Sequence, residues 1–123
     1  MDPFQKNLLQ INEQFGYKGL SANRTNNLKN SRPDGIVILG MGGSGLAGEI
    51  LRHAQGELGL KLPVIIWKDY HLPKVLWSAK RPLYIFVSFS GNTEETVSGL
   101  ETLLKTKPRL AAAIITTGGK LKP

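Results

Sequence analysis

Residues 35–45, which read GIVILGMGGSG, decide the fold class of this chain. Residues 36–39 form a continuous apolar run, which is typical of a strand that is buried on both faces. The glycine-rich segment that follows leads into a stretch with Leu46, Ile50 and Leu51 at helical spacing. A strand that enters a helix through a glycine-rich turn is typical of α/β proteins, so this stretch predicts an α/β fold.

The same strand–turn–helix unit recurs towards the C-terminus. Further short apolar runs predict strands at residues 64–67, 83–87 and 110–115. Apolar residues at helical spacing, among them Val97 and Leu103, predict a helix after the third strand. We expect a short helix at residues 73–79, between the second and the third strand. Together these elements predict a parallel sheet of about four strands flanked by helices, in the flavodoxin-like order 2-1-3-4.

The N-terminal part of the chain precedes the repeating unit. Asp2, followed by a proline, is typical of a helix N-cap, and apolar residues then recur at helical spacing from Phe4 to Phe15. We therefore divide the chain into residues 1–34, an N-terminal helix with a connecting segment, and residues 35–123, the α/β domain. A doubly wound unit usually continues with a helix after its last strand, so we expect this α/β domain to be incomplete.

Composition excludes several classes of protein. The chain has 123 residues, of which 41% are hydrophobic and 20% are charged, the balance of one globular domain. It has no cysteine, which excludes a disulfide scaffold and a thiolate zinc site. No apolar run approaches the ~18 residues of a membrane span, and no signal peptide is recognisable, so we expect a cytoplasmic protein. The net charge of +7 is scattered without a basic block, which favours a solvated surface over nucleic-acid binding.

The glycine-rich turn after the first strand predicts an anion-binding site. Gly42 and Gly43 carry no side chain, so the backbone can approach an anion while the next helix points its free amides at it. Ser44 adds a hydroxyl donor. One alternative is a tight turn that only packs. Another is a dinucleotide site, because the same residues match the G-x-G-x-x-G fingerprint and Asp69 lies near the position where an acidic residue would bind the ribose.

The loop after the third strand, which reads SFSGNT, predicts a phosphate site. Ser88, Ser90 and Thr93 supply three hydroxyl donors around a glycine at the start of a helix. The alternative is ordinary capping by Asn92 with Glu95 three residues later, which would leave the two serines unexplained. In the predicted order the first and third strands are neighbours, so both loops are expected to meet at one crevice.

At this point the chain resembles a known family. The motifs GMGGSG followed by AGEIL, then SFSGNTEET, then ITTGG and a lysine, are similar to those of the sugar isomerase (SIS) domain family. Within it, the chain most resembles the N-terminal half of bifunctional phosphoglucose/phosphomannose isomerases. The resemblance covers roughly residues 35 to 121. It implies a parallel α/β sandwich that binds a hexose 6-phosphate, with neither a cofactor nor a metal.

The resemblance also implies roles for particular residues. The residues that match the phosphate-binding motifs of the family are Gly42, Gly43, Ser44, Ser88, Ser90 and Thr93. Gly118 and Gly119 match the turn expected to line the sugar side. The implied reaction is aldose–ketose isomerisation of glucose 6-phosphate or mannose 6-phosphate to and from fructose 6-phosphate. The implied partner is a second SIS domain, in the same or another chain, and neither nucleic acid nor a membrane is expected.

Catalytic residues are not identifiable in this chain. Isomerisation needs a base, an acid and stabilisation of an enediol. Glu94 and Glu95 fit the first turn of a helix, where carboxylates stabilise the dipole, and Glu49 is expected to be a solvated or paired residue. We expect His53 to be a surface or partly buried residue, and His71 lies in a connection with no partner visible in the sequence. In the family the catalytic glutamate, histidine and lysine lie further along, largely in a second SIS domain. We therefore predict weak binding of sugar phosphate by this chain, without turnover.

Two other functions stay open from the sequence. One is a non-catalytic sugar-phosphate sensor of the kind attached to DNA-binding modules, although no helix-turn-helix pattern precedes residue 35. The other is a dinucleotide-binding domain of an oxidoreductase. The phosphate-site prediction requires that the two loops lie at neighbouring strand ends. It also requires that their hydroxyls are not turned inward onto main-chain partners.

Overall fold

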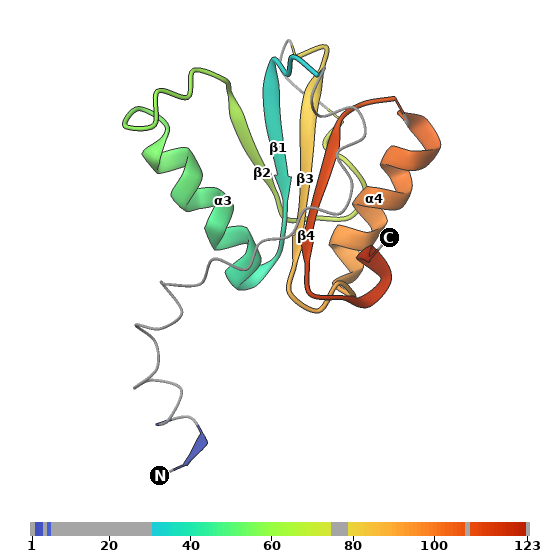
Figure 1. Cartoon of the computed structure of the whole chain (residues 1–123). Coiled ribbons are helices and arrows are strands. Elements are labelled where there is room, and N and C mark those ends of the chain that lie inside the picture. The colour runs from blue at the N-terminus through green and yellow to red at the C-terminus, as the bar shows by residue number, and fades with distance from the viewer. Residues whose placement is uncertain (1, 4, 6–30, 75–78, 108, 123) are drawn as a thin grey trace.

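The structure, a computed structural model, describes residues 2–3, 5, 31–74, 79–107 and 109–122. Its elements are β1 (Gly35–Leu39), α3 (Gly42–Ala54), β2 (Val64–Trp67), β3 (Pro82–Ser88), α4 (Glu94–Thr106), β4 (Ala112–Thr116) and the 3₁₀ helix η1 (Gly119–Leu121). The strands form one parallel sheet in the order β2-β1-β3-β4 (Figure 1). The predicted α/β class and strand order are confirmed.

Each predicted strand is present, with small differences at the ends. β1 begins one residue before its predicted start, β3 extends one residue further at both ends, and β2 agrees with its prediction. β4 begins at Ala112 instead of residue 110. The reason is a turn before the strand, in which the backbone N–H of Leu110 donates to the carbonyl of Lys107 at 3.1 Å. Residues 75–78 of the predicted short helix lie outside the described residues.

The predicted N-cap at Asp2 is confirmed. The Asp2 carboxylate accepts a hydrogen bond from the backbone N–H of Gln5 at 2.9 Å, and the Gln5 side-chain oxygen accepts one from the backbone N–H of Asp2 at 3.3 Å. This reciprocal pair is a capping box, which satisfies two amides at the start of a helix. The rest of the predicted N-terminal helix and the connecting segment up to residue 30 lie outside the described residues.

The apolar run of β1 is continuous because helices cover both faces of the sheet. Figure 1 shows α3 and α4 on opposite faces. The face covered by α4 holds a cluster of Val37, Leu39, Tyr84, Phe86 and Leu103. The face covered by α3 holds Ile36, Ile38 and Val64, with Leu51 of α3 packed against them. Every second residue of β1 therefore faces a different apolar layer, as expected of a central parallel strand.

Two helical glycines let α3 and α4 approach the sheet closely. A Cβ atom on Gly48 of α3 would lie 3.0 Å from Ile66 and 3.1 Å from Ile38, and one on Gly99 of α4 would lie 2.5 Å from Leu39. A larger residue at either position would therefore require the neighbouring side chains or the helix to shift. Both α-helices have 13 residues, and among the described helices none is long and apolar enough to cross a membrane.

Asp34 ties the start of β1 to the start of β3. Its two carboxylate oxygens accept hydrogen bonds from the backbone N–H groups of Lys80 and Arg81, each at 2.8 Å. The hydrogen bond from Lys80 is the largest cause that lowers the pKa of the Asp34 carboxyl below its ordinary value, and the bond from Arg81 adds to it. The ionised form of Asp34 therefore stabilises the folded state.

Replacing Asp34 should destabilise the chain in a pH-dependent way. Because the folded-state pKa of Asp34 is lowered, its contribution is fully present above the unfolded-state pKa of about 3.9 and is lost as the pH falls through the folded-state value. We expect Asp34→Ala to lower the urea midpoint at pH 7, and the difference from wild type to shrink below about pH 4. Asp34→Asn, which cannot titrate, is the matched control. A difference that does not change over this range would contradict the assignment.

Candidate functional site

The two loops singled out by the sequence lie at the same edge of the sheet. β1 and β3 are parallel neighbours, with Leu39 paired to Phe86 near their carboxyl ends. The β1–α3 turn and the β3–α4 loop therefore leave the sheet side by side. Figure 1 shows them at the lower edge, together with the turn from β4 into η1. The first requirement of the predicted phosphate site is met.

The glycines of the first loop belong to the first turn of α3. The helix begins at Gly42, and the N-cap residue Met41 makes no side-chain capping bond. The carbonyl of Met41 accepts from the backbone N–H of Ser44 at 3.0 Å and of Gly45 at 3.3 Å. The amides at the start of a helix have no acceptor within the helix, and this first turn contains no acidic residue. The turn therefore presents free donors and a positive dipole end to an anion.

The glycines in this turn differ in what surrounds them. Gly42 has a φ of +53°, which an L-residue with a side chain rarely adopts, and it is exposed. Gly43 is also exposed, and a Cβ atom added to it would meet nothing within 4 Å. A Cβ on Gly45 would lie 2.8 Å from the carbonyl oxygen of Gly40 and 3.1 Å from Cε of Lys68. Gly45 thus packs the turn, whereas Gly43 opens onto unfilled space.

The hydroxyls of the second loop are partly engaged by the loop itself. Ser88 is only 1% exposed, and its Oγ accepts from the backbone N–H of Gly91 at 3.0 Å. The same Oγ lies 2.8 Å from Oγ1 of Thr93. Ser90 is exposed, and its Oγ accepts from the backbone N–H of Asn92 at 3.1 Å. Ser88 is turned inward onto a main-chain partner, so the second requirement is not met for this residue. Ser90 also has a main-chain partner but lies at the surface.

These contacts still leave protons that can be donated. A hydroxyl that accepts a hydrogen bond keeps its own proton, so Ser90 remains a donor. Either hydroxyl of the Ser88–Thr93 pair can be the donor. If Ser88, which already accepts from Gly91, donates to Thr93, then the Thr93 proton is left for a ligand. Ser88 lies behind the surface and supports this arrangement.

The alternative of capping by Asn92 and Glu95 is wrong. The N-cap of α4 is Thr93, one residue later, and it makes no side-chain capping bond. The side-chain oxygen of Asn92 instead accepts from the backbone N–H of Lys120 at 3.0 Å. Asn92 therefore joins the loop of residues 88–93, which we call the serine loop, to η1, across 28 residues of sequence.

The turn after β4 packs closely against the serine loop and is hydrogen-bonded to it. The backbone N–H of Thr117 donates to the carbonyl of Phe89 at 3.2 Å, and that of Leu121 donates to the carbonyl of Gly91 at 3.1 Å. Gly91 has a φ of +71°, and a Cβ added to it would overlap the carbonyl of Gly118. A Cβ on Gly119 would likewise overlap the carbonyl of Ser90. This packing was not predicted from the sequence, although glycine-containing turns after two neighbouring strands were a visible signal.

Glu49 and Glu94, two carboxylates near this edge, have partners. Glu49 makes an ion pair with Arg52 at 2.9 Å and a longer one with Lys68 at 3.7 Å. Glu94 accepts a hydrogen bond from the Tyr70 hydroxyl at 3.0 Å, and this bond, with the charge of Glu94, raises the pKa of the Tyr70 phenol. The expectation that Glu49 is a paired residue is confirmed, and Glu94 and Glu95 do lie in the first turn of α4.

The two histidines and Asp69 also have hydrogen-bond partners. Nδ1 of His53 lies 2.8 Å from the carbonyl of Glu49, one turn earlier in α3. The backbone N–H of His71 donates to Oγ of Ser98 at 3.0 Å, and its Nδ1 lies 3.2 Å from the Thr102 hydroxyl. These contacts hold the β2–β3 connection against α4. Asp69 is exposed and accepts from the backbone N–H of the next residue at 2.7 Å.

Substitution of Gly91 should damage the fold of the site more than any other single glycine change in the loops. Gly91→Ala forces a side chain into the left-handed region and into the Gly118 carbonyl, so we expect a loss of more than about 3 kcal/mol in unfolding free energy, or failure to fold. Thermal and urea unfolding measure this loss. A Gly91→Ala protein within about 1 kcal/mol of wild type would disprove the interlocked geometry.

Comparisons with known proteins agree with the motifs. The chain is 38% identical, over 118 residues, to a bifunctional phosphoglucose/phosphomannose isomerase of Thermoplasma acidophilum; this covers 96% of the chain and 33% of that protein. It is 43% identical, over 96 residues, to an enzyme of the same name from Caldicellulosiruptor bescii, which covers 78% of the chain and 27% of that protein. A D-glucosamine-6-phosphate 4-epimerase of Sulfolobus acidocaldarius is 38% identical over 87 residues, 71% of the chain and 26% of that protein.

These matches cover most of this chain but only a small part of each relative. No family model and no solved structure matches the chain. The chain spans about a third or less of the length of these curated relatives. The resemblance predicted from the motifs is nevertheless confirmed by several relatives of one name. This chain is a homologue of part of the bifunctional phosphoglucose/phosphomannose isomerases.

Proposed function

We propose that this chain is the sugar-phosphate-binding part of an aldose–ketose isomerase that interconverts glucose 6-phosphate or mannose 6-phosphate with fructose 6-phosphate. The observation that carries the proposal is the parallel pairing of β1 with β3. This pairing brings a helix N-terminus and a hydroxyl-rich loop to one edge of the sheet. Phosphoryl groups bind where such donors converge at strand ends of α/β folds.

In the proposed complex, neutral donors hold the phosphate. The backbone amides of Gly42 and Gly43 and the hydroxyl of Ser44 approach it from α3, and the hydroxyls of Ser90 and Thr93 approach it from the serine loop. Gly43 matters because the space beside it is open. Backbone amides and hydroxyls can bind an anion without a charged side chain, provided that the donors are held in place.

Ser88, Gly118 and Gly119 act on the ligand in different ways in this proposal. Ser88 orients the Thr93 hydroxyl from its buried position. Gly118 and Gly119 keep the serine loop in place through their packing, and their turn borders the side where the sugar would extend.

The names of the relatives support a shared role in phosphate recognition. Two of them are named for isomerisation of phosphorylated hexoses, and a third is named for epimerisation of D-glucosamine 6-phosphate. These reactions differ at the sugar carbons, but each name includes a phosphorylated sugar. A segment that resembles both kinds of enzyme is expected to recognise the phosphate, which their substrates share.

The acid and base of the isomerisation are proposed to come from a second SIS domain in the same or a partner chain. Isomerisation moves a proton between adjacent carbons, so it needs a titrating group close to the sugar. Among the described residues, Glu49 and Glu94 have partners, and His71 faces α4. We therefore propose that the 123-residue chain binds a hexose 6-phosphate weakly and does not turn it over.

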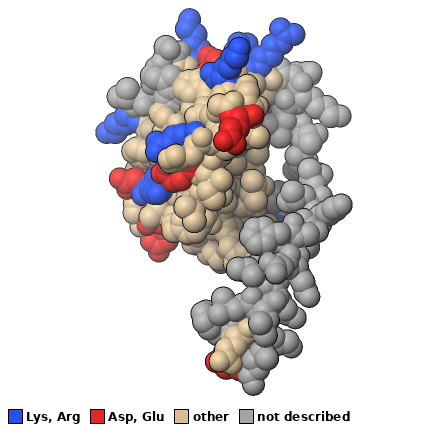
Figure 2. All heavy atoms as spheres, turned by 90° about the vertical axis from the view of Figure 1, so that its left-hand side faces the viewer, with Lys and Arg blue, Asp and Glu red and all other residues tan. Residues whose placement is uncertain are grey.

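An uncovered apolar surface on α3 supports such a partner domain. Leu46 and Ile50 lie one turn apart on the outer side of α3 and are 57% and 62% exposed. Figure 2 faces this helix and shows charged side chains mainly at the top and along one side, with uncharged surface between them. Ile115, on the edge strand β4, is also 53% exposed. Exposed apolar side chains that gather on one helix are typical of an interface.

The role of Thr93 can be tested by removing only its donor. Valine has nearly the shape of threonine but cannot donate, and a hydrogen bond to a charged group contributes roughly 1.5–3 kcal/mol. We expect Thr93→Val to weaken binding of glucose 6-phosphate by a factor of about 10 to 100, and Thr93→Ser to weaken it by less than about threefold. Isothermal titration calorimetry measures both. Equal affinities for wild type and Thr93→Val would exclude a donor role.

The proposed anion-binding turn at the start of α3 can be tested with two glycines at which an added Cβ atom would meet no neighbour. A Cβ on Gly43 or on Gly56 meets nothing within 4 Å, and neither has a positive φ, but only Gly43 lies in the first turn of α3. We expect Gly43→Ala and Gly56→Ala to change stability by about 1 kcal/mol or less. Gly43→Ala should weaken phosphate binding at least about tenfold, equivalent to ~1.4 kcal/mol, while Gly56→Ala leaves it unchanged. If both variants bind like wild type, the anion does not lie against this turn.

A further inference from the structure

Lys68 lies against the proposed anion-binding turn, although the sequence analysis did not single it out. It is the first residue after β2. Its Cε atom is 3.1 Å from the position that a Cβ on Gly45 would occupy, so its alkyl chain runs along the first turn of α3. The alkyl chain of a lysine therefore packs against the first turn of α3, and its charge lies near the N-terminal end of that helix.

The ammonium group of Lys68 is held only weakly in this structure. Its Nζ lies 3.7 Å from Oε1 of Glu49, near the outer limit of an ion pair, and its side chain is 48% exposed. The other carboxylate oxygen of Glu49 pairs with Arg52 at the shorter distance of 2.9 Å. Glu49 would keep its better partner if Lys68 turned away. An exposed ion pair of this kind contributes little, so exchanging it costs little.

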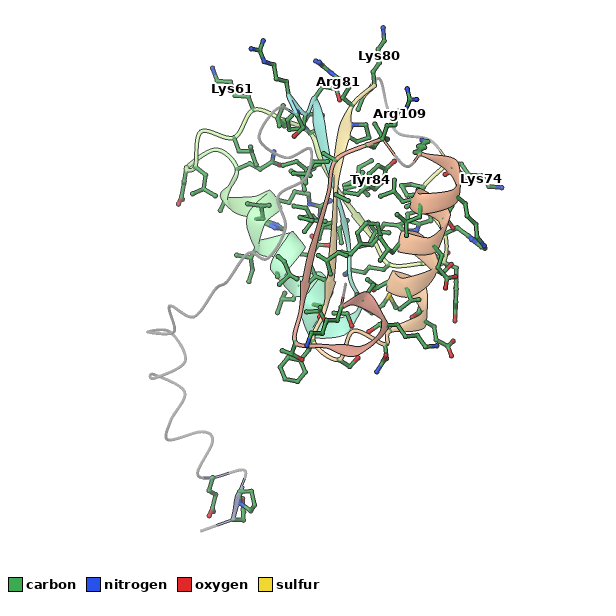
Figure 3. All side chains as sticks on the ribbon, turned by 45° about the vertical axis from the view of Figure 1, so that its right-hand side comes forward. Lys61, Lys74, Lys80, Arg81, Tyr84 and Arg109 are labelled. Atoms are coloured by element: carbon green, nitrogen blue, oxygen red, sulfur yellow. The ribbon has the colours of Figure 1, made fainter. Side chains whose placement is uncertain are left out.

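Several other basic side chains are too far away to act in the same manner. Figure 3 shows Lys61, Lys80, Arg81 and Arg109 at the opposite edge of the sheet, where the strands begin. A five-residue strand spans ~16 Å, at about 3.3 Å per residue, which exceeds the Debye length of roughly 8–10 Å at ordinary ionic strength. Their charges are largely screened at the carboxyl edge. Lys68 is placed where a charge can act on the site.

We infer that Lys68 is a specificity-determining residue of the proposed phosphate site, and that its ammonium group exchanges Glu49 for an oxygen of the bound phosphoryl group. This inference rests on the proposed function. The exchange gives the otherwise neutral donor set a preference for a charged phosphoryl group over an unphosphorylated sugar. Glu49 acts in the opposite direction, because it competes with the ligand for the same ammonium group.

The first test compares two lysines that flank the same strand. Lys61 precedes β2 and Lys68 follows it, so Lys61→Gln and Lys68→Gln remove the same charge at opposite edges of the sheet. We expect Lys68→Gln to weaken binding of inorganic phosphate and of glucose 6-phosphate by roughly three- to tenfold, and Lys61→Gln by less than about 1.5-fold. Lys68→Arg keeps the charge and should restore most of the affinity. Calorimetric titration of the 123-residue chain at fixed ionic strength measures each value.

The second test uses Glu49 in a double-mutant cycle. Glu49→Gln should tighten phosphate binding by about two- to fivefold in the wild-type background, because Lys68 is released, and should have almost no effect in the Lys68→Gln background. Equal tightening in both backgrounds would show a general charge effect and would overturn the inference. Thermal unfolding of each variant establishes that it is folded.

The outcomes also separate this inference from the proposed function. If Lys68→Gln behaves like Lys61→Gln while Thr93→Val still loses binding, the inference about Lys68 is wrong and the phosphate site stands. If the wild-type chain binds neither inorganic phosphate nor glucose 6-phosphate, the proposed function and the inference both fall.

Discussion

The parallel pairing of β1 with β3 is the constraint on which the candidate site depends. Parallel strands end at the same edge of a sheet, so the two loops that follow β1 and β3 have to emerge together. The pairing is in turn enforced by burial, since β1 is apolar on both sides and has a helix against each face. A shift of β1 by one residue would exchange its two apolar layers and would move the glycine-rich turn relative to the serine loop.

A second constraint acts on the loops themselves. The serine loop is fixed by the turn after β4, through backbone hydrogen bonds and through glycines whose missing side chains let the two turns touch. Donors that are held by the protein before a ligand arrives lose less entropy on binding and need less reorganisation than mobile donors. Asn92 is central here, because its side chain binds Lys120 rather than capping α4. The geometry of the serine loop therefore depends on residues that follow it by almost thirty positions.

Much of the fold could be predicted from the sequence, because the signals that determine it are local. Continuous apolar runs indicated the positions of the four strands. The handedness and length of the connections left only a few possible orders, and the flavodoxin-like one was chosen because it brings the two special loops to one crevice. The start of β4 was missed by two residues, because the turn at Leu110 depends on a hydrogen bond to Lys107 that apolar character does not report. The position of Lys68 beside Gly45 was equally hidden, since it depends on how two elements pack.

The chemistry of the serine loop could be predicted only in part, because a hydroxyl can serve the protein and a ligand at once. Sequence reasoning counted Ser88, Ser90 and Thr93 as three equal donors. Burial distinguishes them: Ser88 is inside and accepts from a main-chain amide, whereas Ser90 is at the surface. Because each hydroxyl has one proton and two lone pairs, Ser88 can accept a hydrogen bond from the Gly91 amide and still donate one to Thr93. When Ser88 donates to Thr93, the Thr93 proton is left for a ligand at the edge where β1 and β3 end, and this donor carries no charge.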